Sequence, residues 1–501
     1  MPNISAKIEA SRIKDEASYK AMRDLFEKEH GFVMTVTPED GIDIPPHLEH
    51  MKGHCFKTGT TKEEFANLKK ELAMYCKWFE LEDEPSAPIW NENDARRLAA
   101  GKPAAADAES EATPDFVSLQ THLADPPSGL GANRLHATNI PGSRGEKVKV
   151  FVIENGVHEE HEDRPKNFMG TAFGAAFSSL DHGTSVYGLI GGNDENGFGI
   201  KGIAPNVQFY SIANSAGLTR SLVEILKLSD PVLDTVFVGI ELQYAPMPEF
   251  GVPYQYVPPT QFSSVRDIIR LLTEKGVHVF IAAANGGADL DDPRFGGVFH
   301  EDVGAVMVGA GSRDAHNPLP FSGYGDPVHV CGQGYWVVTT GYGGLWNGGY
   351  PNRTYTDGFN GTSSSLPMPL ACGAIAMAML IAQNKHTLTP RELRQLLIET
   401  GTPQAQSNKH IGPFPNLLKL KHRLVPGPDY DLDGVVKFND FIQFAAYYQA
   451  SDRAADLNGD GLVNFDDFLV FTRSFNGPAK WAVMPAAKWA VKRIDGQRKI
   501  A

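Results

Sequence analysis

Three short segments of the sequence contain residues that could together activate a hydroxyl group. The segment VIENG contains Glu154, the segment DHGTSVYG contains His182, and the segment NGTSSSLP contains Ser363. A serine hydroxyl becomes an effective nucleophile when a neighbouring imidazole takes its proton. A carboxylate then holds the imidazole in the correct tautomer and stabilises the imidazolium that forms. These residue types predict nucleophilic catalysis, provided that folding brings them together.

The pattern of apolar residues places each candidate at the end of a secondary-structure element. Glu154 follows a strand expected over 147–153, and Ser363 directly precedes an apolar helix expected over 366–382. A fourth segment, AAANGG, contains Asn285 and follows a strand expected over 277–283. Such positions can meet at the carboxyl edge of one parallel sheet, where open α/β folds bind ligands. Backbone N–H groups at a helix N-terminus suit a developing oxyanion.

In this order, the four segments resemble those of the subtilisin-like serine peptidases, and the resemblance covers about residues 140–400. It implies that Ser363 is the nucleophile, His182 the general base and acid, and Asn285 the oxyanion donor, with Glu154 in the acid position. It also implies a serine endopeptidase that acts on protein or peptide substrates. The alternative is a catalytically impaired subtilisin fold that serves as a binding or attachment protein.

Several residues depart from the family pattern. The family normally has aspartate where this chain has Glu154, so the strand end must sit back slightly for the longer side chain to reach the imidazole. The sequence here resembles a divergent branch that uses glutamate. Ser365 and Leu366 replace Ala and Ser, and Ala284 replaces a glycine. The segment beginning at Glu241 replaces the Ser-Leu-Gly-Gly type of segment, and an acidic pocket that favours basic side chains is one interpretation.

Strand and helix signals alternate through residues 115–422, which we assign to the peptidase domain. Strands are expected over 147–153, 207–213, 235–240, 277–283 and 305–309. Short apolar runs that alternate with helices predict an α/β fold with a parallel sheet covered on both faces. The resemblance implies the three-layer subtilisin-like fold with a mainly parallel central sheet. The apolar stretch 366–382 is shorter than the ~20 residues of a membrane span, so we expect a buried core helix and no membrane span.

Two twelve-residue loops, 429–440 and 456–467, begin 27 residues apart and share one pattern. Each has carboxylates or amides at positions 1, 3, 5 and 12 and glycine at position 6, which permits the sharp turn of a calcium loop. Position 7 offers a backbone carbonyl oxygen. The expected Ca²⁺ ligands are Asp429, Asp431, Asp433, Val435 and Asp440 in the first loop, and Asp456, Asn458, Asp460, Leu462 and Asp467 in the second.

An apolar helix is expected after each loop, but Pro-Gly-Pro at 426–428 precedes the first, unlike a helix-loop-helix hand. Residues 423–478 instead resemble a dockerin type I module. Phe438 and Phe465 occupy positions where cellulosomal dockerins usually carry small polar residues for their cohesin partner. The resemblance implies a cohesin-like or cell-surface partner, and a structural or attachment role is the alternative.

The remaining segments are assigned from composition. Residues 1–99 are charged and helix-prone, and are either a pro-segment, as the peptidase resemblance implies, or an unrelated helical extension. Residues 100–114 lack large apolar side chains and are predicted to be an exposed linker, with cleavage expected within 104–113 if the first segment is removed. The tail, 479–501, repeats AKWAV and suggests no function.

Charge and cysteine content narrow the possible functions. A formal net charge of -14 argues against nucleic acid as a partner, because phosphate binding needs a positive field. The four cysteines, Cys55, Cys76, Cys331 and Cys372, are too few for a disulfide scaffold, although two bridges are possible. No apolar signal segment is visible at the start of the sequence, whereas the family resemblance implies a secreted or extracellular protein.

Overall fold

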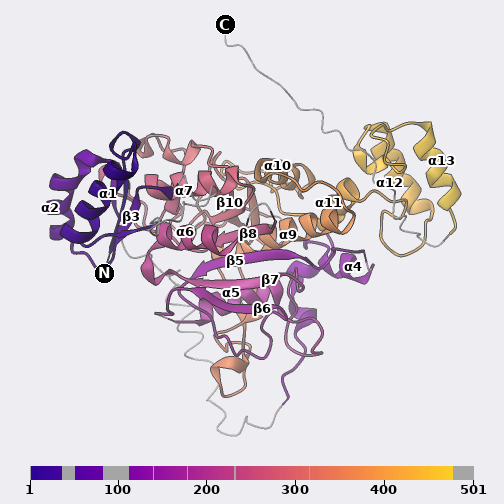
Figure 1. Cartoon of the computed structure of the whole chain (residues 1–501). Coiled ribbons are helices and arrows are strands. Elements are labelled where there is room, and N and C mark those ends of the chain that lie inside the picture. Colours follow the sequence, from indigo (N-terminus) through magenta and orange to yellow (C-terminus); the bar gives the residue numbers. More distant parts are fainter. Residues whose placement is uncertain are drawn as a thin grey trace.

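The computed structural model describes residues 2–35, 51–82, 112–138, 140–177, 179–230, 233–314 and 316–477. The predicted tail and most of the predicted linker lie outside the described residues. The described chain forms an N-terminal sheet domain, a central α/β domain and a C-terminal helical module (Figure 1). Figure 1 shows the first and the last of these at opposite ends of the central domain.

A seven-stranded parallel sheet forms the middle layer of the central domain, as expected. Its order is β11-β10-β9-β8-β5-β7-β6, and every neighbouring pair is parallel. The strands are β5 (Val148–Glu154), β6 (Phe168–Phe173), β7 (Gln208–Ala213), β8 (Thr235–Ile240), β9 (His278–Ala282), β10 (Val306–Gly311) and β11 (Val330–Gln333). The five predicted strands are present within a few residues. The sequence prediction missed β6, which is an edge strand of partly exposed residues, and β11, which has four residues.

Helices cover both faces of this sheet, which explains the near-continuous apolar strands. Side chains of β5 alternate between two cores: Val150 and Val152 pack with one set of helices, Phe151 and Ile153 with the other. The first set is α4 (Ala132–Ala137), α5 (Asp181–Gly191), α8 (Thr362–Ser365), α9 (Pro367–Ala382), α10 (Pro390–Thr400) and α11 (Leu417–Leu424); the second is α6 (Leu218–Leu228) and α7 (Ser263–Glu274). The arrangement is the expected three-layer fold.

The apolar helix α9 lies inside this structure. The segment Thr362–Ala382 is long and apolar enough to cross a membrane, yet 89% of its most apolar window is buried within the fold. Its buried residues pack with β5, β8 and β11. The segment is therefore the core helix that the sequence predicts.

A small antiparallel sheet leads the chain into the candidate serine. Its order is β12-β14-β13, with β12 (Val337–Thr340), β13 (Trp346–Asn347) and β14 (Thr354–Phe359). The strand β12 packs against α5, and β14 ends just before α8. This sheet therefore ties the segment that precedes Ser363 to the helix that carries His182.

The N-terminal segment contains a sheet as well as the expected helices. It consists of β1 (Asn3–Ile8), α1 (Glu16–Asp24), β2 (Val33–Met34), β3 (His54–Lys57), α2 (Lys62–Leu72) and β4 (Cys76–Glu82). The antiparallel order is β2-β3-β1-β4, and Phe26, Phe32 and Phe79 centre its own core. A β-α-β-β-α-β order with this strand arrangement is typical of ferredoxin-like domains.

The C-terminal module contains two helices, α12 (Phe438–Gln449) and α13 (Phe465–Ser474), each following one of the aspartate-rich loops. Phe444 and Phe471 stack with ring centroids 4.8 Å apart at its centre. The module contacts the central domain closely: Arg134 Nη1 donates to Asp431 O over 2.8 Å, and His422 Nε2 lies 2.9 Å from Tyr430 O. The loop that would bind the first calcium is thus packed against α4 and α11.

Candidate active site

Glu154 and His182 meet at the carboxyl edge of the sheet. Glu154 ends β5, and His182 is the second residue of α5, so both are placed by main-chain elements. His182 Nδ1 lies 2.7 Å from Glu154 Oε1, and the two residues are only 6% and 2% exposed. A proton on Nδ1 satisfies this contact and leaves Nε2 as the acceptor. The longer acid therefore reaches the imidazole, as the sequence required.

Close backbone packing fixes the position of His182. A side chain at Gly183 would place a carbon 2.3 Å from the carbonyl oxygen of Gly156, so only glycine lets α5 approach the end of β5 this closely. The imidazole packs edge-on against Phe359, with ring centroids 5.4 Å apart. His182 Nε2 is buried and has no hydrogen-bond partner among the described residues. That nitrogen is available to accept a proton.

Ser363 lies in the short helix α8, which packs against α5. Gly361, directly before this helix, has a φ of 97°, which glycine adopts without strain. The neighbouring hydroxyls are held by backbone carbonyls: Ser364 Oγ donates to Gln333 O over 2.9 Å, and Ser365 Oγ lies 3.2 Å from Gly332 O. Ser363 Oγ does not form the hydrogen bond to His182 in this structure. In free enzymes such catalytic contacts often tighten only when substrate binds.

Asn285 follows β9 and is fixed against the segment that carries the serine. Its Oδ1 accepts hydrogen bonds from Thr362 N over 2.8 Å and from Thr362 Oγ1 over 3.1 Å. Because a backbone N–H can only donate, the atom facing it is the amide oxygen, and Nδ2 remains as the donor. The backbone N–H of Asn285 donates to Gln243 Oε1 over 2.8 Å. Sequence reasoning missed this support by Gln243.

Glu241 is a second buried acid in the site and was not among the predicted site residues. It follows β8, which lies in the sheet between the strand ending in Glu154 and the strand leading to Asn285. It is 2% exposed. Burial, and then the charge of Glu154, raise the pKa of its carboxyl group well above the usual value, while the Ser363 hydroxyl lowers it. The carboxyl group of Glu241 is therefore buried in the site, and an acidic pocket that favours basic side chains remains a prediction.

With this geometry established, comparison with known proteins identifies the family. The sequence profile of the Subtilase family matches residues 145–413, more than half of the chain. This chain belongs to the subtilase family.

Individual relatives agree with this assignment. The subtilase is 28% identical over 288 residues to subtilisin DY of Bacillus licheniformis, a match that spans 55% of this chain and 91% of that protein. It is 25% identical over 270 residues to the minor extracellular protease Epr of Bacillus subtilis, spanning 52% of this chain and 36% of that protein. Among solved structures, a protease of Pseudoalteromonas arctica aligns with a TM-score of 0.47 at 19% identity, covering 62% of this chain and 98% of that one. Membership of the subtilase family and similarity to subtilisin DY make the chain a serine-type endopeptidase.

One departure from the family pattern has a visible backbone cost in this subtilase. Ala284, which stands where the family usually has glycine, adopts a φ of 70°. A residue with a Cβ atom in the left-handed region costs roughly 1–2 kcal/mol. Ala284 immediately precedes Asn285, and its carbonyl oxygen accepts from Gly323 N over 3.0 Å. This strain is held next to the proposed oxyanion donor.

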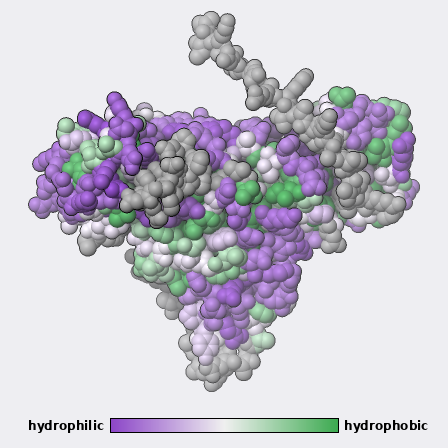
Figure 2. Space-filling model, in the orientation of Figure 1, coloured by the Kyte–Doolittle hydropathy of each residue, from purple (hydrophilic) through white to green (hydrophobic). Residues whose placement is uncertain are grey.

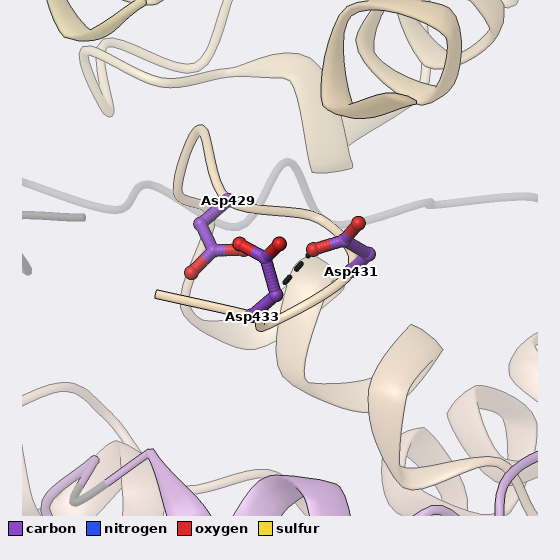
Figure 3. A group of neighbouring side chains, drawn as sticks. All are labelled: Asp429, Asp431 and Asp433. Carbon is purple, nitrogen blue, oxygen red and sulfur yellow. Dashed lines mark hydrogen bonds between the residues drawn. The ribbon is translucent and has the colours of Figure 1, made fainter. Parts of the chain in front are cut away.

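The first predicted calcium loop of the subtilase brings three of its carboxylates together. Ligand oxygens of Asp429, Asp431 and Asp433 lie within 4.8 Å of one another (Figure 3). Asp429 Oδ1 is buried without a hydrogen-bond partner among the described residues. Burial raises the pKa of both Asp429 and Asp431. A hard cation bound by oxygen atoms would remove this unfavourable crowding, so the residues fit Ca²⁺.

The second loop repeats the backbone contacts of the first. Gly434 N donates to Asp429 Oδ2 over 3.0 Å, and Gly461 N donates to Asp456 Oδ2 over the same distance. Asn458 Oδ1 accepts from Asp460 N over 2.9 Å. Two loops with the same internal hydrogen bonds have the same geometry, which supports the duplication inferred from sequence.

The aspartates at position 12 do not join these clusters in the structure. Asp440 is buried, and its oxygens accept from the N–H groups of Tyr430, Asp431 and Lys437 over 2.7, 3.0 and 2.8 Å. Asp467 repeats the pattern in the second loop, accepting from Leu457, Asn458 and Asn464. The two residues therefore shape the loops here, and a role as ligands remains a prediction. The same holds for the carbonyl oxygens of Val435 and Leu462.

Proposed function

We propose that this subtilase cleaves internal peptide bonds through an acyl-enzyme on Ser363. In this proposal His182 is the general base and acid, Glu154 is its carboxylate partner, and Asn285 is the oxyanion donor. The observation that carries the proposal is the buried 2.7 Å contact between Glu154 and His182, because it leaves an imidazole nitrogen free beside α8. Protein and peptide substrates follow from the family.

The proposed reaction follows from these positions. His182 Nε2 takes the proton of Ser363 Oγ while that oxygen attacks the carbonyl carbon of the substrate. Glu154 stabilises the imidazolium through Nδ1, and Asn285 Nδ2 donates to the oxyanion of the tetrahedral intermediate. His182 then gives its proton to the leaving amine, and the bond between carbon and nitrogen breaks. A water molecule, deprotonated by the same imidazole, releases the acyl group from Ser363.

Labelling with a fluorophosphonate probe tests this proposal against the alternative of an impaired binding protein. We expect the wild type and Ser364→Ala to label and Ser363→Ala to remain unlabelled. Ser364 is a matched control because it is the adjacent hydroxyl and bonds only to backbone carbonyls in the structure. A wild type that is cut in the linker yet does not label would favour the binding protein.

We propose that the N-terminal domain, within residues 1–99, is a pro-segment that docks on the peptidase. Its last strand, β4, supplies two acidic side chains to helix N-termini of the central domain. Glu80 accepts from the N–H groups of Ser263 and Ser264 over 2.9 and 2.8 Å, at the start of α7. Glu82 accepts from Thr219 N over 3.4 Å, at the start of α6. Carboxylates at helix N-termini accept hydrogen bonds from free N–H groups and interact favourably with the positive end of the helix dipole.

Additional contacts between the two domains support this docking. Lys77 Nζ and Trp78 Nε1 both donate to Asp267 Oδ2 on α7, over 2.8 and 2.9 Å. An unrelated extension would have no reason to place Glu80 and Glu82 at the N-termini of two helices of the peptidase. Release would follow cleavage of the linker, for which residues 104–113 remain the expected site.

We propose that the C-terminal module binds Ca²⁺ and stabilises the peptidase domain. Asp429, Asp431 and Asp433 would hold one ion; Asp456, Asn458 and Asp460 would hold the other. Lys437 Nζ pairs with Asp433 over 2.6 Å in the first loop, and the ion would neutralise the remaining carboxylate charge. Direct packing of the first loop on Arg134 and His422 supports a structural role.

A cohesin-like or cell-surface partner is the second proposal for this module. Phe438 and Phe465, at equivalent loop positions, are 65% and 63% exposed, and Figure 2 shows apolar surface on the module.

Known relatives include both a minor extracellular protease and an intracellular serine protease. We favour an extracellular location because calcium loops of this kind suit calcium-rich surroundings. Detection of the chain in the culture medium would test this.

A further inference from the structure

Glu154 and Glu241 lie side by side on one face of the sheet. In the register of β5 and β8, Ile153 pairs with Ile240, and each glutamate is the next residue. Both isoleucines point into the core beneath α6 and α7. Because side chains alternate along a strand, both glutamates point to the opposite face, which carries α5, α8 and α9. Neighbouring strands are about 4.8 Å apart, so the two carboxyl groups share one buried space.

The two acids differ in their partners. Glu154 contacts His182 Nδ1 over 2.7 Å and accepts from Asn155 N over 3.3 Å. Neither oxygen of Glu241 meets the geometry of a hydrogen bond with any described residue, although the Ser363 hydroxyl lies close enough to influence its carboxyl group. Two carboxylates in one buried site cannot both ionise, so the acid without a cationic partner keeps its proton.

Among the described residues, no basic side chain forms an ion pair or a hydrogen bond with Glu241. The charge that acts on Glu241 is that of Glu154 on β5, and His182 on α5 is engaged by Glu154. The helix α9 carries no charged residue; Leu366 and Leu370, at its start, cover Gly239 on β8. Gln243, on the segment after β8, and Asn285, on the segment after β9, are neutral amides. The site therefore favours the neutral form of Glu241.

We propose that Glu241 is a positioning residue that acts, as an uncharged carboxylic acid, on the hydroxyl group of Ser363. Its O–H donates a hydrogen bond to Ser363 Oγ, which leaves the serine proton directed to His182 Nε2. The donated hydrogen bond also stabilises negative charge that develops on Oγ, and Glu241 keeps its proton throughout. This inference rests on the proposed role of Ser363 as nucleophile.

The proposal predicts an activity that depends on the proton of Glu241. Once ionised, Glu241 can only accept, so Ser363 Oγ–H turns toward it and away from His182. Activity then falls on the alkaline side as Glu241 loses its proton. The amide of Glu241→Gln can still donate but cannot ionise, whereas Glu241→Ala removes the donor.

The proposal is tested by measuring kcat/KM on a chromogenic peptide as a function of pH. The measurement compares the processed wild type with Glu241→Gln, Glu241→Ala and Ser363→Ala. We expect Glu241→Gln to stay within about tenfold of the wild type at neutral pH and to lose the alkaline fall. Glu241→Ala should lose roughly 10²-fold, the usual cost of an active-site donor. An independent readout is the infrared band of a protonated carboxylic acid at neutral pH, which should be present in the wild type and reduced in Glu241→Gln.

Two outcomes overturn the proposal. The first is the same alkaline profile in Glu241→Gln and the wild type. The second is an infrared spectrum in which the substitution removes no protonated acid, a result that does not depend on Glu241→Ala being folded. Activity that persists in Ser363→Ala would instead reject the proposed nucleophile, so the two failures are distinguishable.

Discussion

Glu154 Oε1 and His182 Nδ1 are 2.7 Å apart in a space that excludes solvent, across the end of β5 and the start of α5. The contact shows that the glutamate at the end of β5 reaches the imidazole, as its proposed role requires. The carboxylate keeps its charge and both acceptor atoms, and the close packing of Gly183 on Gly156 sets the separation of the two elements. The distance is thus defined by the backbone as well as by the side chains.

Substitutions of Glu154 should separate the effect of its negative charge from the effect of its side-chain length. Glu154→Gln keeps the length but removes the charge and lets the imidazole adopt the wrong tautomer, so we expect kcat to fall about 10⁴-fold. Glu154→Asp keeps the charge but shortens the side chain, and misplacement by about 1 Å can cost about 10²-fold. Steady-state kinetics on a peptide substrate check both. Wild-type activity in Glu154→Gln would contradict the assigned role.

The docking of the N-terminal domain should depend on Glu80 and Glu82. Each carboxylate caps a helix of the central domain, and loss of a cap costs about 1 kcal/mol. After cleavage in the linker, the combined Glu80→Gln and Glu82→Gln variant should therefore release the domain more readily on gel filtration. Glu63→Gln is the control, since Glu63 is exposed on α2. Equal retention in all three proteins would contradict the proposed caps.

Calcium removal should destabilise the whole described chain rather than the module alone. The first loop contacts Arg134 on α4 and His422 on α11, so an ion that stabilises the loop also stabilises this junction. Chelation should lower Tm in the wild type, and Asp429→Asn should reduce that response. Asp466→Asn is the matched control, because Asp466 is exposed and outside the proposed ligand set. A melting curve unaffected by chelator would reject calcium binding.

Lys421 should make stability depend on pH at this same junction. It is completely buried in α11, and burial lowers its pKa from 10.5 to about 7. Between pH 7 and pH 10.5, Lys421 is protonated in the unfolded chain but has lost its proton in the folded chain. Folding is therefore least favourable near and below pH 7, and its stability rises toward pH 10.5 as the unfolded state also loses the proton.

Lys421→Met removes this titration while keeping an apolar chain of similar length. We expect the substitution to raise Tm relative to the wild type more at pH 6 than at pH 9, measured by calorimetry with calcium held constant. A difference in Tm that does not change with pH would contradict the assignment of this titration to Lys421.

The sequence predicted those features that depend on local pattern. Glu154, His182, Asn285 and Ser363 could be placed because strand ends and helix starts are visible in apolar periodicity and glycine positions. The role of Glu241 was not predictable, since its burial depends on which strands become neighbours. The N-terminal sheet was missed for a similar reason: β1, β3 and β4 are short and mixed in polarity, and pair across long stretches of sequence. The contacts of Asp440 with three backbone N–H groups were not predictable because they are a property of the folded loop, and its role as a ligand stays a prediction.

The most direct test of the account is to locate the covalent adduct. Processed protein is treated with a fluorophosphonate, digested, and sequenced by tandem mass spectrometry. The account predicts a single phosphonylated residue, Ser363, with loss of the adduct when His182 is replaced by alanine. An adduct on another serine, or undiminished modification without the imidazole, would contradict it.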